Sequence, residues 1–201
     1  MKAVHLGMGA VLAIMLGGCG FNLLPAPSVN AVMTPADIGF SVDDKGKVTI
    51  VDNSIQFFAT SGSPGATILN YKVHYFDAAG QPIIPGDNIS MGALGTFVAP
   101  GRTCDNADPV TKACDINTAK NLGYTTGPLS ASATFAPLNY EIALAMLRVG
   151  SALGQTTNGW HATITFSGMD ELNRPFSFDL ADVGIRNPLG KASLKTLGEQ
   201  P

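Results

Sequence analysis

The sequence predicts an all-β protein built as a two-sheet antiparallel sandwich. Apolar residues recur at every second position in several short segments, which is the spacing of a strand with one buried face. Turn-forming residues separate these segments, since the chain of 201 residues contains 23 glycines and 13 prolines. Hydrophobic residues make up 45% of the chain, enough for a core. A net charge of −3 provides no basic surface, so we expect no nucleic-acid partner.

Several segments alternate clearly enough to assign their faces. In 69–75, Leu69, Tyr71, Val73 and Tyr75 are predicted to face inward, and Asn70, Lys72 and His74 outward. In 54–61, the predicted inward residues are Ile55, Phe57 and Ala59, and in 130–136 they are Ala131, Ala133 and Phe135. Each segment therefore predicts a strand.

Residues 160–185 predict a hairpin. Trp160, Ala162, Ile164 and Phe166 share one face, and the turn residues Gly168, Asp170 and Asn173 follow. On the return strand the inward positions are Phe176, Phe178 and Leu180, then Val183 and Ile185. This change from even to odd numbers predicts a β-bulge at Ala181–Asp182.

Residues 139–150 predict one short crossover helix. Ile142, Ala145, Met146 and Val149 fall on one helical face. Asn139 can cap the start of the helix, and Gly150 is placed to end it. Such a helix would link two strands across one end of the sandwich.

About seven alternating strands with one long crossover resemble an immunoglobulin-like or fibronectin type III-like domain over residues 45–187. The hairpin "GWHATITFSGMDELNRPFSF" is similar to the last two strands of bacterial envelope domains of this type. The resemblance implies adhesion, spacing or assembly. Residues 188–201 would form a C-terminal tail.

The N-terminus predicts an extracytoplasmic, membrane-anchored protein. Lys2 precedes an apolar run from Ala3 to Leu16, which is typical of a signal peptide, here residues 1–18. Leu16-Gly17-Gly18-Cys19 resembles a bacterial lipobox, and this resemblance implies a diacylglycerol on Cys19. Residues 19–44 are then the lipidated N-terminus and tether. Gly20 favours the outer membrane if the organism has two membranes.

Nine residues lie between Cys104 and Cys114 in "CDNADPVTKAC". Outside the cytoplasm, two such thiols most simply form a disulfide, because a metal site would need further thiols or histidines. We expect this disulfide to pin a long insertion over residues 86–127, and long connections are commonly functional.

The sequence contains no catalytic motif, so we expect no enzymatic activity, no small-molecule substrate, and no cofactor beyond the lipid on Cys19. The leading hypothesis is an interaction subunit of a larger envelope assembly, such as a surface-layer or outer-membrane complex. The alternative is a calcium- or glycan-binding module in the 86–127 insertion, with Asp105, Asp108 and Asp115 as calcium candidates.

Other polar candidates have simpler structural explanations. His74 and His161 are expected on neighbouring strands, but two histidines lack the third ligand of a catalytic zinc. Asp170 and Glu171 fall on a predicted turn, where acidic residues are common. We predict that Trp160 belongs to the core rather than to a sugar-binding platform, because its neighbours at every second position are apolar. No metal site is therefore predicted outside the three aspartates.

Overall fold

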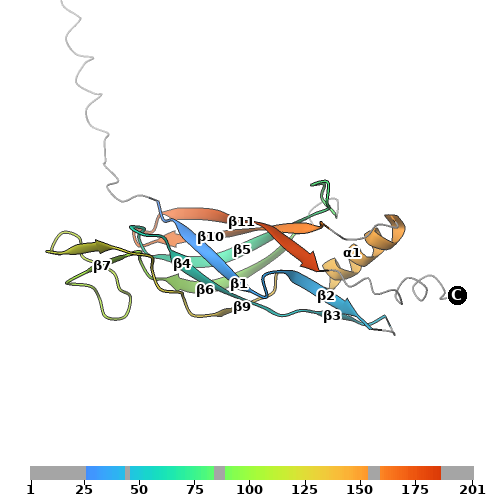
Figure 1. Ribbon diagram of the computed structural model, residues 1–201, viewed down its shortest axis with the longest axis horizontal. Coiled ribbons are helices and arrows are strands. Elements are labelled where there is room, and N and C mark those ends of the chain that lie inside the picture. The colour runs from blue at the N-terminus through green and yellow to red at the C-terminus, as the bar shows by residue number, and fades with distance from the viewer. Residues whose placement is uncertain (1–25, 44–45, 84–88, 154–158, 187–201) are drawn as a thin grey trace, which may run out of the picture.

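The computed structural model describes residues 26–43, 46–83, 89–153 and 159–186 (Figure 1). The predicted signal peptide, the predicted lipidation site Cys19 and the predicted tail 188–201 lie outside these residues. Among the described residues, no helix is long and apolar enough to cross a membrane.

The described chain is mostly β-structure, as predicted. One sheet has six strands, in the order β3 (Val48–Ile50), β2 (Ile38–Val42), β11 (Pro175–Arg186), β10 (His161–Asp170), β5 (Ala66–Phe76) and β6 (Ser90–Val98). A second sheet has three strands, in the order β1 (Val29–Thr34), β4 (Asn53–Ala59) and β9 (Ala133–Phe135). A third pairs β7 (Arg102–Cys104) with β8 (Leu122–Tyr124), and the helix α1 spans Tyr140–Leu153.

The prediction of a purely antiparallel arrangement is wrong at one position. β2 runs parallel to β11, with Ile38 opposite Ile185 and Gly39 opposite Arg186. Gly39 lies so close to β11 that a Cβ there would come within 2.7 Å of the Arg186 carbonyl oxygen. The missing side chain therefore permits this short parallel pairing.

The tether predicted over 19–44 is wrong for its second half, because Val29–Thr34 and Ile38–Val42 form β1 and β2. The chain passes from one sheet to the other between them, at the cis peptide Thr34–Pro35. The buried Asn53 amide holds this crossing, since its nitrogen donates to the carbonyls of Pro35 and Asp37, both at 3.0 Å. The β-structure of the domain therefore begins well before residue 45.

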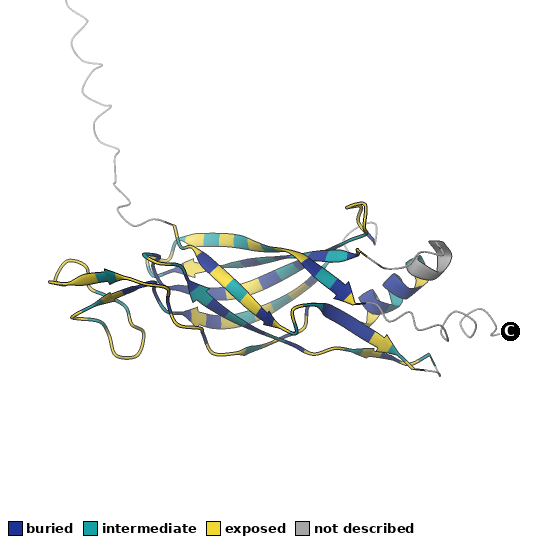
Figure 2. Ribbon diagram, viewed as in Figure 1, coloured by how far each residue is buried: buried dark blue, intermediate teal, exposed yellow. Residues whose placement is uncertain are grey.

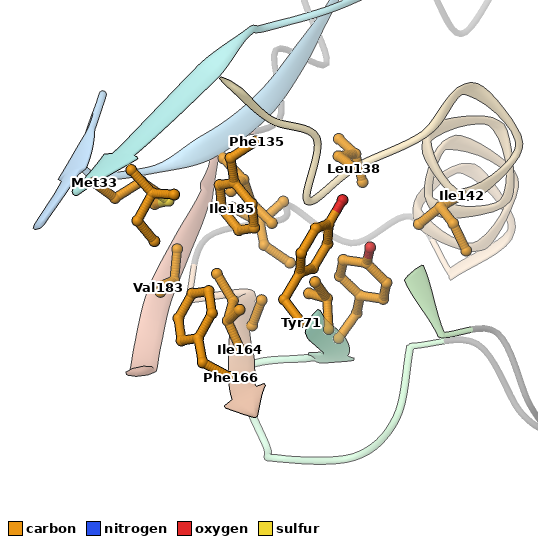
Figure 3. Close-up of a cluster of buried hydrophobic side chains, with 14 of the residues drawn as sticks. Met33, Tyr71, Phe135, Leu138, Ile142, Ile164, Phe166, Val183 and Ile185 are labelled. Atoms are coloured by element: carbon orange, nitrogen blue, oxygen red, sulfur yellow. The ribbon is translucent and has the colours of Figure 1, made fainter. Parts of the chain in front are cut away.

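Aromatic side chains join the two larger sheets in the core. The ring of Phe57, on β4, packs edge-on against Phe166 of β10, with the ring centroids 5.1 Å apart. It also packs edge-on against Phe178 of β11, with the centroids 6.2 Å apart. Figure 3 shows Phe166 among other buried hydrophobic side chains, and Figure 2 shows buried and exposed residues alternating along the strands. Trp160 is 3% exposed, which confirms its predicted place in the core.

The β10–β11 hairpin and its bulge follow the prediction. Ala162 lies opposite Val183 and Ile164 opposite Leu180, so two β11 residues face the single residue Thr163. Those two are Ala181 and Asp182, and Asp182 has a positive φ of 56°. Among the side chains predicted to face inward, Val183 and Ile185 are buried and Phe178 packs against the core.

The predicted inward position of Leu69 is wrong. Its side chain is 38% exposed, whereas Ile68 is fully buried. Ser167 pairs with Asn70 and Gly168 with Ile68, so Leu69 is an extra, bulged residue on β5 relative to β10. A bulge shifts the alternation by one, and simple counting along the strand does not reveal it.

The helix begins as predicted and ends later. Asn139 caps it, because the Ile142 backbone N–H donates to Asn139 Oδ1 at 2.8 Å. The helix continues to Leu153 instead of ending at Gly150. Its fully described buried positions are Ile142, Ala143, Met146 and Leu147. Ala145 and Val149 are half-buried.

Candidate functional site

The structure divides the predicted 86–127 insertion into two parts with different surroundings. Residues 86–88 lie outside the described residues. The first described part contains β6, an outer strand of the six-stranded sheet. The second part, residues 102–124, contains β7, β8 and the loop between them, and is called here the disulfide hairpin. It projects at the end of the molecule opposite α1 (Figure 1).

The disulfide hairpin is joined to the sandwich through Gly101. The Gly101 N–H donates to the Ser63 carbonyl at 2.9 Å, and its own carbonyl accepts from Gly62 at 2.6 Å and Thr125 at 3.1 Å. A Cβ at residue 101 would lie 1.8 Å from the Thr60 carbonyl oxygen. Only glycine allows these backbones to approach so closely, so the base of the hairpin is fixed.

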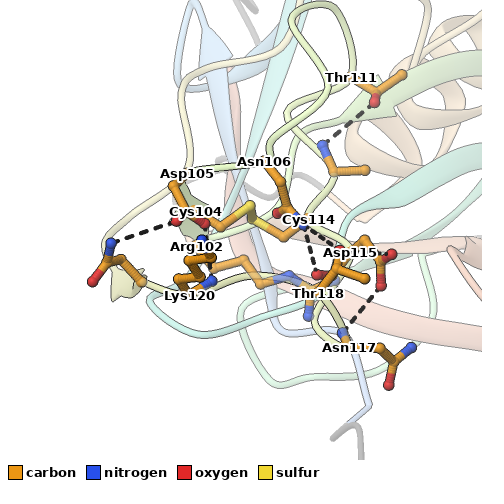
Figure 4. Close-up of a disulfide and its surroundings, with 12 residues drawn as sticks. Arg102, Cys104, Asp105, Asn106, Thr111, Cys114, Asp115, Asn117, Thr118 and Lys120 are labelled. Atoms are coloured by element: carbon orange, nitrogen blue, oxygen red, sulfur yellow. Dashed lines mark hydrogen bonds between the residues drawn. A yellow bond between two sulfur atoms is a disulfide. The ribbon is translucent and has the colours of Figure 1, made fainter.

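The predicted disulfide is present (Figure 4). Cys104 and Cys114 are bonded, with Cα atoms 5.9 Å apart. Cys104 ends β7, where it lies opposite Leu122 of β8. The disulfide therefore ties Cys114, in the middle of the loop, to the end of β7.

The three calcium candidates bind the backbone and side chains of their own loop. Asp108 accepts from the N–H groups of Val110 and Thr111 at 2.8 and 2.6 Å. Bonds from Thr111 and Val110 lower the pKa of the Asp108 carboxyl group. Asp115 accepts from the Thr118 hydroxyl at 2.9 Å, which is the main cause of its lowered pKa.

Asp105 completes this network by accepting from the Lys120 N–H at 3.1 Å and the Asn121 amide at 3.4 Å. Among the described residues, no three His, Cys, Asp or Glu side chains lie close enough to hold a metal ion. The three aspartates therefore stabilise turns at separate points of the loop. This arrangement gives no support to the calcium hypothesis.

A buried ion pair connects the hairpin to the turn between β10 and β11. Arg102, whose side chain is 6% exposed, lies 2.6 Å from the Glu171 carboxylate. Arg102 Nε and Glu171 Oε1 are buried without a hydrogen-bond partner. The neighbouring Asp170 is paired separately with Arg174, also at 2.6 Å. Asp170 and Glu171 are thus each paired with a different arginine. These ion pairs give both acidic residues a structural role.

The two histidines lie on neighbouring strands, as expected, and both are in contact with the ring of Phe76. His74 lies opposite Thr163, and His161 lies opposite Phe76. The Phe76 ring is nearly parallel to each imidazole, and its centroid lies 6.5 Å from that of His74 and 5.6 Å from that of His161. This geometry provides an aromatic stack on the outer face of the sheet.

β6 and the adjacent sheet face form the second part of the candidate site. No charged residue occurs in β6, and its Met91 side chain is 72% exposed. A shallow hollow of about 440 Å³ lies beside Met91, and Lys72 and Thr165 are among its lining residues. No described strand pairs with the outer edge of β6. Unpaired N–H and C=O groups at such an edge can pair with another chain.

Sequence reasoning missed both Arg102 and the exposed residues beside β6. Arg102 lies 69 positions from Glu171 in the sequence. The spacing of nearby residues therefore does not reveal their contact. Comparisons with models of known protein families and with curated proteins find no match. The functional argument therefore depends on the chain's own geometry and sequence.

Proposed function

We propose that this protein is a lipid-anchored envelope protein without enzymatic activity that serves as an interaction subunit of a larger surface assembly. The anchor is the acylated Cys19, as implied by the lipobox resemblance of residues 16–19. Several acyl chains on one cysteine would hold the protein on a membrane. The partner is an envelope protein of the surface layer or outer membrane, and it adds an extended segment to β6.

An immunoglobulin-like assignment fits the distribution of strands between sheets. In that fold the third, sixth and seventh strands share one sheet, and the second and fifth share the other. Here β5, β10 and β11 lie in one sheet while β4 and β9 lie in the other. The assignment supports a role in assembly because such domains present their sheet edges and end loops to partners.

The uncharged free edge of β6 is the observation that carries the partner proposal. Natural proteins commonly protect an edge strand with lysine, proline, a bulge or a covering segment. β6 has one of these features, a bulge in which Leu94 and Gly95 oppose the single residue Leu69. The bulge leaves the stretch from Ser90 to Ala93 regular, and no described strand pairs with its outer side. A partner strand can therefore extend the sheet there.

The side chains around this edge supply further contact area. Met91 and Ala93 are exposed on the strand itself. The hollow beside Met91 is lined by both apolar and polar groups, so it can receive a partner side chain. In strand addition, main-chain hydrogen bonds provide affinity and such side-chain sites provide specificity.

The test is extraction of the native protein from membranes with mild detergent, followed by mass spectrometry of the intact complex and of the chain. We expect a stoichiometric protein partner and an acylated Cys19. Met91→Lys should remove the partner, because it places a charge on the strand-addition surface. The matched control is Val32→Lys on β1, an outer strand of the other sheet, where Val32 is 43% exposed.

Two results would contradict the proposal. An acylated chain that always travels alone would remove the assembly role. Loss of the partner in Val32→Lys but not in Met91→Lys would move the contact to the other sheet.

A further inference from the structure

The end of the domain that carries the disulfide hairpin has an unusual number of exposed apolar side chains. Val110 is 84% exposed and Tyr124 is 70% exposed, and both belong to the disulfide hairpin. Leu172, in the β10–β11 turn, is 52% exposed. Ile116 and Leu122 of the hairpin are also exposed, as is Met169 near the end of β10. We call this set of six residues the apolar end.

Backbone hydrogen bonds place the start of the described domain at the same end. The Thr60 N–H donates to the Ser28 carbonyl at 2.9 Å. In the turn that follows Thr60, the Ser63 carbonyl accepts from the Gly101 N–H at the base of the hairpin. The Glu171 N–H donates to the Gly65 carbonyl at 3.2 Å, which brings the β10–β11 turn alongside. β1 accordingly begins near β7, and α1 lies at the far end (Figure 1).

The distance from Cys19 limits how far this end can lie from a membrane. Ser28 lies nine positions after Cys19, and a fully extended chain of that length spans about 30 Å. β10 contains 10 residues, so the strands themselves extend about 30 Å away from this end. With Cys19 in the bilayer, the apolar end is the near end and α1 is the far end.

We propose that the apolar end contacts the lipid surface of the membrane in which Cys19 is anchored. This inference rests on the proposed lipidation. Tyrosine and aliphatic side chains suit the boundary between headgroups and acyl chains, where one end of the tyrosine side chain remains hydrated. The bilayer would cover exposed apolar surface that the domain itself leaves in water.

The hairpin is already ordered for this contact. Its disulfide and the turns held by Asp108 and Asp115 fix the loop that carries Val110. Preorganisation lowers the entropy lost on binding. The exposed charges of the loop nearly balance, with Asp105, Asp108 and Asp115 against Lys112 and Lys120. We therefore expect contact with an uncharged phosphatidylcholine surface and no requirement for anionic lipid.

The test uses the full-length acylated protein in phosphatidylcholine vesicles with and without brominated acyl chains, which quench tryptophan fluorescence. Tyr124→Trp places a probe at the apolar end, and Tyr140→Trp places one at the start of α1, where Tyr140 is 53% exposed. The native Trp160 is present in both variants and in the wild type, which provides the baseline. We expect bromination to quench Tyr124→Trp more than the wild type and Tyr140→Trp no more than the wild type.

A second pair of variants tests the apolar contact itself. Val110→Asp in the Tyr124→Trp protein should reduce the extra quenching, because an uncompensated carboxylate resists transfer into the interface. Val51→Asp is the matched control, since Val51 is 41% exposed and lies beside β3 at the far end. It should leave the quenching of Tyr124→Trp unchanged.

The possible failures are distinguishable by measuring the mass of the chain first. An unacylated Cys19 would overturn the lipoprotein proposal, and the membrane contact with it. An acylated protein in which Tyr124→Trp is quenched no more than Tyr140→Trp would overturn the membrane contact alone. Shielding of Tyr124→Trp in the native complex, but not in vesicles, would instead assign the apolar end to a protein interface.

Discussion

Arg102 and Glu171 form a buried ion pair between the base of the disulfide hairpin and the β10–β11 turn. Their side chains approach to 2.6 Å and are 6% and 20% exposed. The pair joins two segments that are far apart in sequence and together carry the apolar end. This ion pair therefore helps to hold the hairpin in place against the β10–β11 turn.

Arg102→Met should lower the free energy of unfolding by about 2–3 kcal/mol, because it leaves the Glu171 carboxylate without its partner in a mostly buried position. Urea denaturation of the variant and the wild type measures this difference. The double variant Arg102→Met/Glu171→Met should lose less stability than Arg102→Met alone, since both charges are then removed together. A larger loss in the double variant would contradict this account.

The matched control is Arg186→Met, which removes the ion pair between Arg186 and Asp37. The Arg186 side chain is 73% exposed. Exposed pairs contribute at most about 1 kcal/mol because water screens them. An equal loss in the two arginine variants would show that the burial of Arg102 is unimportant.

Tyr71→Phe should destabilise the protein by about 1 kcal/mol or slightly more. The Tyr71 hydroxyl donates to the Ala136 carbonyl at 3.0 Å, just before the helix, and its removal leaves a carbonyl without a partner. Burial raises the pKa of Tyr71 and outweighs the opposite effect of this hydrogen bond. Thermal unfolding checks the prediction, with the exposed Tyr140→Phe as control; a comparable loss in the control would refute it.

Asp170→Asn should destabilise the protein in a pH-dependent manner. Burial raises the pKa of Asp170, but bonds from Arg174 and Leu172 outweigh burial and lower it overall. Because the folded-state pKa lies below the unfolded value of about 3.9, the ionised carboxylate stabilises the fold above about pH 4. This contribution is lost as the pH falls through the folded-state pKa.

The stability difference between wild type and Asp170→Asn should therefore be constant from about pH 5 to 8 and shrink below about pH 4. Urea unfolding at a series of pH values gives this curve. Asp179→Asn, at an exposed position of β11, should stay within about 0.5 kcal/mol of the wild type. If the stability difference between wild type and Asp170→Asn grew as the pH fell, the pKa of Asp170 in the folded protein would be raised and not lowered.

Reduction of the Cys104–Cys114 disulfide should lower the free energy of unfolding by about 2–3 kcal/mol, since the bond closes a short loop. The sequence separation of the two cysteines is 10. Cys104→Ser/Cys114→Ser should reproduce the effect of reduction and be insensitive to reductant. The strand signal in circular dichroism should persist in the folded variant, because β7 and β8 belong to neither of the two larger sheets. Its loss would show that the disulfide supports the whole sandwich.

The sequence alone determined the features that depend on neighbouring residues. Alternation predicted β4, β5, β10 and β11, and the change of parity between Leu180 and Val183 predicted the bulge that the structure contains. Asn139 marked the start of the helix. Two cysteines at short spacing predicted the disulfide. Each signal arises from backbone geometry or chain closure within a short segment, so it can be recognised without the rest of the fold.

How these elements meet depends on contacts between distant parts of the chain. The parallel pairing of β2 with β11 joins residues nearly 150 positions apart, and the bulge at Leu69 depends on the register of a neighbouring strand. The Arg102–Glu171 pair and the apolar end likewise bring distant segments together. Their physical origin is the packing of two sheets around one core, which selects pairings and exposures that local periodicity leaves open.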